Sequence, residues 1–187
     1  MIHTAKNLTD IHHGRRTFLR GCAGLLATLA STPLLSATTT PERKLSFHSL
    51  HTGESLKATY WAEGDYINSE LEAINHVLRD HRTDEIYTMD KDLLDQLFLL
   101  QHSMVSKKPF HVISGYRSPK TNQKLHSKSS GVAKRSLHMQ GKAIDIRLPG
   151  TQLSELRNAA KKLKLGGVGY YQKSDFIHVD TGRVRYW

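Results

Sequence analysis

The sequence is poor in several features that would otherwise decide its class. It has a single cysteine, Cys22, among 187 residues, so one chain alone cannot form a disulfide. It has no internal repeat and no linker between two long domains, and its length is that of one domain. Acidic residues are scarce: 27 lysines and arginines face 17 aspartates and glutamates, for a net charge of +10. This charge favours an acidic partner or a solvated basic surface, but no basic run is dense enough to resemble a nucleic-acid-binding arm.

An uninterrupted apolar segment of membrane-spanning length is missing as well. Near the N-terminus, Arg15 and Arg16 are followed by a Phe-Leu pair and an apolar stretch, a pattern that resembles a twin-arginine export signal. Four residues interrupt that stretch and make it too weak for a stable membrane span: Thr28, Ser31, Thr32 and Pro33. We therefore predict that residues 1–37 form a twin-arginine signal peptide, removed near Ala37. An uncleaved anchor is the alternative.

The rest of the chain then consists of a short polar linker, residues 38–43, and one domain, residues 44–187. Cys22 is lost with the leader, so the exported protein has to fold without a disulfide. The leader also takes four basic residues and Asp10 with it, which leaves 23 basic and 16 acidic residues and a net charge of +7. The exported protein therefore remains basic.

Hydrophobic periodicity predicts a mixed domain. Apolar residues alternate on both sides of a turn at 51–54, which predicts a β-hairpin. Asp90 and Thr151 are expected to cap two of the predicted helices. Helices are expected within 66–82, 89–104 and 151–164, a short helix and a basic loop within 118–136, and strands at 109–115, 143–148 and either side of a turn at 172–175. This order of elements favours an α+β fold with a largely antiparallel central sheet and packing helices.

One acidic residue stands in an unusual place. Asp145 lies within the apolar segment AIDI, where a carboxylate is costly unless a cation pairs with it. His138 precedes it by seven residues, which span about 23 Å in a strand and about 10 Å in a helix. One metal can therefore bind both only if the chain folds back between them, and Gly141 provides the permissive backbone. The pair favours zinc, and a salt bridge from Asp145 to Arg147 is the alternative.

A third ligand is needed, because a catalytic zinc site uses three protein ligands and keeps one position for water. His178 lies in a second apolar strand segment, and Asp180 shares its face two residues later. We expect His138, Asp145 and His178 to bind Zn2+, with Asp180 orienting His178. Asp175 lies three residues before His178 and is expected to be the general base. Alternatively, Asp175 is only a turn residue and Asp180 only caps the following turn.

These segments carry a family resemblance. SLHMQGKAID fits the pattern S-x-H-x-x-G-x-A-x-D of the zinc D-alanyl-D-alanine peptidase and hedgehog superfamily, which fixes five of ten positions. DFIHVD is similar to the acid-x-x-His element of that superfamily, in which the acid is the general base, although several branches carry glutamate where this chain has Asp175. SGYRS matches its arginine segment, which implies that Arg117 binds substrate or an oxyanion. LHTGES and the segments GGVGYY and HVDTG further resemble the twin-arginine-exported murein endopeptidases of the K type.

The resemblance covers about residues 44–187 and implies a hedgehog and D,D-peptidase-like fold, a Zn2+ cofactor and a periplasmic location. It implies a zinc-dependent endopeptidase that hydrolyses peptide cross-links of peptidoglycan, with the stem peptides as partners. A D-alanyl carboxypeptidase or dipeptidase of the same fold is one alternative, and a non-catalytic zinc-containing wall-binding module is another. For Arg117 alone, the alternative is an ordinary exposed arginine. No nucleic-acid partner is expected, because export removes the chain from nucleic acid.

Overall fold

The computed structural model describes residues 41–129 and 131–187. The predicted signal peptide at 1–37 lies outside these residues, as does the first half of the predicted linker at 38–43. The described residues all belong to one compact unit. Among the described residues, no helix combines the length and the apolar character needed to span a bilayer.

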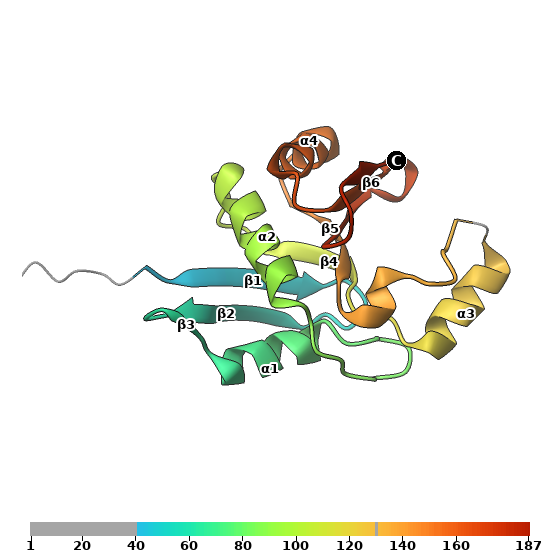
Figure 1. The fold of residues 1–187 in the computed structure, drawn as a ribbon, viewed down its shortest axis with the longest axis horizontal. Helices are drawn as coiled ribbons and strands as arrows, with labels where there is room; N and C mark the ends of the chain where they lie inside the picture. Colours follow the sequence, from blue (N-terminus) through green and yellow to red (C-terminus); the bar gives the residue numbers. More distant parts are fainter. Residues whose placement is uncertain (1–40, 130) are drawn as a thin grey trace, which may run out of the picture. The chain divides into compact units, whose positions relative to one another are not determined.

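The described chain alternates strands and helices in an order close to the predicted one (Figure 1). The predicted hairpin is present as two antiparallel strands, and the three predicted amphipathic helices are all present. In chain order the elements are β1 (Arg43–Ser49), β2 (Ser55–Ala62), β3 (Asp65–Tyr66), α1 (Asn68–Val77), α2 (Lys91–Ser103), β4 (Phe110–Ser114), α3 (Pro119–Lys128), the short 3-10 helix η1 (Leu137–Gln140), β5 (Ala143–Arg147), α4 (Leu153–Leu163), β6 (Gly167–Tyr171), η2 (Gln172–Ser174), β7 (Phe176–Asp180) and β8 (Arg185–Tyr186).

The strands form a single eight-stranded sheet in the order β3-β2-β1-β4-β5-β7-β6-β8. Two pairings, β1 with β4 and β6 with β8, are parallel. The remaining pairings within the described sheet are antiparallel. The prediction of an α+β fold with a largely antiparallel sheet is therefore confirmed.

Helices cover one face of this sheet, and the hydrophobic core lies between the two layers. In Figure 1, α1 runs along β2 and β3, α2 crosses β1, and α4 lies beside β5 and β6. Ile144 and Ile146 of β5 are fully buried in the core with Ile177 and Val179 of β7, and they pack with the leucines of α2 and α4. Because side chains alternate along a strand, Asp145 and His178 point to the opposite, open face.

The ends of two helices test the capping predictions. The Asp90 side chain accepts a hydrogen bond from the Asp92 backbone N–H, so Asp90 caps α2 as predicted. The prediction that Thr151 caps α4 is wrong, because the N-cap is Gln152, which makes no side-chain cap hydrogen bond. The Thr151 backbone N–H instead donates to the Leu148 carbonyl in the preceding turn, so the helix begins one residue later.

Candidate metal centre

The open face of the sheet brings Asp145 and His178 together through strand pairing. Asp145 of β5 is the direct cross-strand partner of His178 of β7 in the antiparallel ladder. The register between β4 and β5 shifts between Val112 and Ser114, and this irregularity puts Ser114 beside Asp145. Irregularities of this kind are common next to active sites, because they turn a side chain towards a face of the sheet that regular pairing would not give it.

His138 reaches the same place from η1. The Ser136 side chain accepts a hydrogen bond from the His138 backbone N–H and caps this short helix. Gly141 ends it with φ +65°, and a side chain there would collide with the Thr88 carbonyl. The chain therefore folds back at Gly141 as predicted, and this turn returns it to β5 and Asp145.

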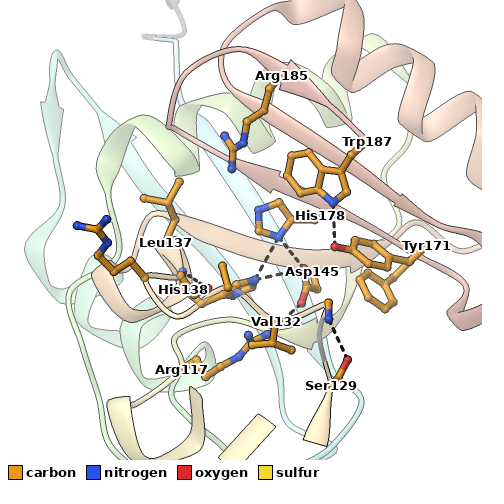
Figure 2. Close-up of a pocket in the computed structure, with 15 residues that line it drawn as sticks. Arg117, Ser129, Val132, Leu137, His138, Asp145, Tyr171, His178, Arg185 and Trp187 are labelled. Carbon is orange, nitrogen blue, oxygen red and sulfur yellow. Dashed lines mark hydrogen bonds and ion pairs between the residues drawn. The ribbon is translucent and has the colours of Figure 1, made fainter. Parts of the chain in front are cut away.

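Three donor atoms meet at the centre of this arrangement (Figure 2). His138 Nε2 lies 3.2 Å from His178 Nδ1 and 3.3 Å from Asp145 Oδ1, and His178 Nδ1 lies 2.9 Å from Asp145 Oδ1. Tetrahedral zinc with bonds of about 2.0–2.1 Å separates its ligand atoms by about 3.3 Å. Two imidazole nitrogens and a carboxylate oxygen at this spacing fit a zinc-like ion.

The outer nitrogen of each histidine is held by an acceptor. His138 Nδ1 donates to the Gly115 carbonyl at 2.7 Å, which leaves the lone pair on Nε2. His178 Nε2 is 2.9 Å from Asp180 Oδ2, which likewise leaves Nδ1 to face the other donors. Asp180 is itself fully buried and accepts from Arg185 and from the backbone N–H groups of Gly167 and Gly182. Such contacts fix the ring orientation of metal-binding histidines.

Burial and pairing act in opposite directions on the charges of the cluster. Burial raises the pKa of Asp145, but His138 and His178 outweigh it and hold that pKa well below its ordinary value. Burial lowers the pKa of His178, but hydrogen bonds with Asp145 and Asp180 raise it to about 9. A doubly protonated imidazole cannot bind a metal, so metal binding at His178 competes with the proton that these carboxylates favour.

Arg117 lies at the edge of this cluster and is not the exposed arginine of the alternative reading. Its Nη2 is 3.5 Å from Asp145 Oδ2, and its side chain is 11% exposed. Its backbone N–H donates to the His138 carbonyl, which ties the arginine loop to the histidine. Burial lowers the pKa of Arg117, and its Nε has no hydrogen-bond partner among the described residues. The Arg117 guanidinium is therefore fixed in position, and its Nε–H group remains available to donate a hydrogen bond.

The loop that carries Arg117 rests on a buried carboxylate. Asp80 accepts hydrogen bonds from the backbone N–H of Ser118 at 2.8 Å and of Arg82 at 2.9 Å. Burial raises the pKa of Asp80, but hydrogen bonds from Thr121, Arg82 and Ser118 outweigh it and lower the pKa to about 2. Asp80 is therefore ionised when the protein is folded, and it positions the Arg117 loop without touching the metal cluster.

The cluster lies at the bottom of a hollow of about 430 Å³ that also includes Arg117, and we call it the first hollow. Tyr171 and Trp187 line one side, and the Trp187 indole N–H donates to the Tyr171 hydroxyl at 2.9 Å. Neither Tyr171 nor Trp187 is among the site residues predicted from the sequence. Gly169 is the one residue in the sequence that hints at the position of Trp187. A side chain at this position would overlap the Trp187 ring, so the glycine leaves space for it.

The structure does not bring Asp175 to this cluster. Its side chain is 61% exposed, and its Oδ2 accepts from Arg147 Nη1 at 2.7 Å. It lines a different, second hollow together with Arg147. Asp175 is the C-cap of η2 with φ +53°, so its backbone follows the turn and not the strand that carries His178. The alternative pairing of Asp145 with Arg147 is also absent: within the described chain, Asp145 contacts Arg117 and Arg147 contacts Asp175.

Comparisons with known proteins agree with one another. A family model described as peptidoglycan L,D-endopeptidase MepK matches residues 37–187. The Escherichia coli (strain K12) protein named peptidoglycan L,D-endopeptidase MepK is 44% identical over 174 residues, which are 92% of this chain and 96% of that protein. A Haemophilus influenzae protein named probable peptidoglycan L,D-endopeptidase MepK is 36% identical over 182 residues, 97% of this chain and 98% of that protein. The similarity thus extends over the whole described domain.

Proposed function

This chain belongs to the family of peptidoglycan L,D-endopeptidase MepK, and we propose that it is a zinc-dependent enzyme that hydrolyses peptide cross-links of peptidoglycan. The resemblance to murein endopeptidases of the K type, drawn from the sequence motifs, is confirmed. As a member of this family the protein is a hydrolase and a metallopeptidase. The fold is proposed to be hedgehog and D,D-peptidase-like, with the sheet in the order given above.

The observation that carries the zinc proposal is the convergence of three donor atoms within 2.9–3.3 Å of one another. His138, Asp145 and His178 would hold the ion, and Gly115 and Asp180 would hold the two rings in the required tautomers. An ion held by these residues would supply Lewis-acid chemistry towards a peptide carbonyl and would lower the pKa of water towards neutrality.

Two side chains of the first hollow are suited to bind the peptide that is cut. Arg117 presents a buried guanidinium with an unpartnered Nε, which suits a substrate carboxylate or the developing oxyanion. The Tyr171 hydroxyl accepts from Trp187, so its own proton is free to be donated to a substrate carbonyl. Asp145 is the single side-chain carboxylate lining this hollow among the described residues. We therefore do not assign the base role to Asp175.

The bond proposed to be cut is an L,D peptide bond, as the names of the relatives say for those proteins. The first hollow continues past the metal cluster to Tyr171, Trp187 and the segment 131–133. That extent gives room for peptide on both sides of a scissile bond, whereas a carboxypeptidase or dipeptidase needs room on one side only. A wall-binding module without turnover would not need a buried arginine beside the metal cluster with an unpaired Nε–H group.

The N-terminal segment is proposed to direct export through the twin-arginine pathway into the periplasm, where peptidoglycan lies. The proposal rests on the pattern of Arg15, Arg16 and the following Phe-Leu pair. The net charge of +7 that remains after residue 37 suits a substrate whose stem peptides carry carboxylates.

One experiment tests the proposed function as a whole. The purified protein is incubated with defined cross-linked muropeptide dimers, with and without a chelator, and the products are weighed by mass spectrometry. We expect monomers to appear only without chelator, with masses that identify cleavage of an L,D bond. Removal of a single terminal D-alanine would favour the carboxypeptidase instead. Intact dimers in the presence of zinc-loaded protein would favour the wall-binding module.

A further inference from the structure

A second hollow lies beside the first on the open face of the sheet. It measures about 260 Å³ and is lined by Arg147, Asp175, His111 and the turn 149–151. Its two charged groups, Arg147 and Asp175, form an ion pair of 2.7 Å at its edge. The His111 Nδ1 atom is buried and has no hydrogen-bond partner among the described residues. This hollow therefore presents one cation and one anion to a ligand.

The ion pair leaves much of its binding capacity unused. A guanidinium has five N–H donors in a planar fork, and within the described chain Arg147 uses one of them, Nη1, on Asp175. Oδ1 of Asp175 has no contact of this kind in the described structure. The two side chains are 37% and 61% exposed, so water reaches both of them. Exposed pairs of this kind are held together weakly and exchange partners readily.

The second hollow is within reach of a substrate bound at the metal cluster. Arg147 and Asp145 point to the same face of β5 and lie two residues apart, a distance of about 7 Å along the strand. On β7, Phe176 lines the first hollow, and its neighbour Asp175 lines the second. A peptide that crosses the cluster along β5 would therefore place a side chain or a chain end over the Arg147 and Asp175 pair.

We propose that Arg147 and Asp175 form a subsite for a zwitterionic amino-acid centre of the substrate, that is, an α-ammonium group beside an α-carboxylate. The carboxylate would bind the guanidinium fork in two-point fashion, and the ammonium would bind the free oxygen of Asp175. The two opposite charges stand side by side in the protein as they do in such a centre. This inference rests on the proposed function, because it assigns part of the cross-linked stem peptide to this hollow.

The subsite also gives Asp175 a role that differs from that of a general base. A base acts on the reacting atoms, so its loss lowers kcat for every substrate, usually by about 10²- to 10⁴-fold. A specificity residue acts through binding, so its loss raises KM only for substrates that carry the matching group. The two roles therefore predict different responses to changes in the substrate.

The experiment compares three synthetic cross-linked stem-peptide dimers with the full zinc-loaded protein. One dimer carries a free amino-acid centre, the second has its ammonium acetylated, and the third has its carboxylate amidated. We expect each modification to lower kcat/KM of the wild type about 10-fold, chiefly through KM. Arg147→Gln should no longer distinguish the intact from the amidated dimer. Asp175→Asn should no longer distinguish the intact from the acetylated dimer.

Asp84→Asn is the matched control. Asp84 is also an exposed aspartate with a positive φ, +56°, and it is paired with an arginine, Arg79, at 2.9 Å. It lies outside both hollows, so this variant should keep both substrate preferences.

Equal cleavage of the three dimers by the wild type would overturn the subsite and leave the proposed function standing. A uniform 10²- to 10⁴-fold loss of kcat in Asp175→Asn on all three dimers would also overturn it and assign the base role to Asp175. Failure of the zinc-loaded wild type to cleave any dimer would overturn the proposed function and the subsite together.

Discussion

The two hollows on the open face contain similar charged groups, but these groups are buried to different extents. Each has an aspartate beside cationic or imidazole groups: Asp145 lies on β5, and Asp175 ends η2 just before β7, the strand that pairs with β5. In the first hollow, the side chains of His138, Asp145 and Arg117 are 3%, 8% and 11% exposed. In the second, Arg147 and Asp175 are 37% and 61% exposed.

This difference in burial decides what each group of charges can do. A buried carboxylate is costly unless partners surround it, and removing one partner leaves the others uncompensated. The first hollow is therefore a fixed arrangement, suited to holding a metal. An exposed pair is solvated on its own, so its partners can be exchanged for those of a ligand. Five substitutions test this contrast, and the one expected to be most damaging comes first.

The largest effect is expected from His138→Ala in the first hollow. Three protein ligands leave no redundancy, so zinc and activity should be lost together. Metal content measured by mass spectrometry, with dimer cleavage on the same sample, checks this. His102→Ala, a change on the exposed side of α2, serves as the control. Stoichiometric zinc in folded His138→Ala protein would remove this histidine from the site.

Arg117→Gln should retain zinc and lower kcat by about 10²- to 10³-fold, the usual effect of removing a group that stabilises an oxyanion. The buried position of the guanidinium beside Asp145 is the reason to expect a large effect. Steady-state kinetics on the cross-linked dimer measures it, with the exposed Arg82→Gln on a neighbouring loop as the control. A loss of less than threefold would mean that Arg117 only balances the charge of Asp145.

Asp180→Asn tests whether a residue that contacts a proposed metal ligand, but not the metal, affects zinc binding. Asp180 orients His178 at 2.9 Å without facing the other donors, so we expect zinc to bind about 10- to 100-fold more weakly. Competition with a chromophoric chelator gives the affinity. An unchanged affinity in a folded variant would reduce Asp180 to a cap for the turn at Gly182.

Asp80→Asn is expected to act through stability. The folded pKa of about 2 lies below the ordinary 3.8, so the carboxylate stabilises the folded state above about pH 4. That contribution is lost as the pH falls from 4 towards 2. The shift corresponds to about 2 kcal/mol. Urea unfolding at pH 7 and pH 3 should show a large difference from the wild type at pH 7 and a smaller one at pH 3. The same difference at both values would contradict the assignment.

Asp175→Asn should change stability least. Its pair with Arg147 is exposed, and exposed pairs contribute about 0.2–1 kcal/mol, less at high salt. Urea unfolding of this variant beside Asp84→Asn measures the difference. A loss of several kcal/mol would show that the pair is structural and that the contrast between the two hollows fails.

Much of the fold could be predicted from the sequence, because each element has its own local pattern. The alternation of apolar residues in AIDI and FIHVD separates the core face of β5 and β7 from the open face. Asp90 was identified as a cap because an aspartate before an apolar-periodic segment has few other roles. Thr151 fits the same rule but is used in a turn with Leu148, and only the tertiary path of the chain reveals that.

The same contrast between a local sequence pattern and the tertiary path of the chain separates the proposed metal ligands from Asp175. His138, Asp145 and His178 were grouped from their types and spacing, and the structure brings their donor atoms together because strand pairing and the turn at Gly141 dictate it. The position of Asp175 depends on the backbone of η2, which points the side chain towards Arg147. Trp187 and Arg185 were missed because β8 returns beside β6, a long-range pairing that no local pattern specifies.

The most direct test of the account is a zinc titration of metal-free protein, followed by dimer cleavage. Activity should rise linearly with added zinc and stop rising at one equivalent, and His138→Ala protein should show neither the binding nor the rise. Full activity without added metal, or a rise that continues well beyond one equivalent, would contradict a single catalytic ion at His138, Asp145 and His178.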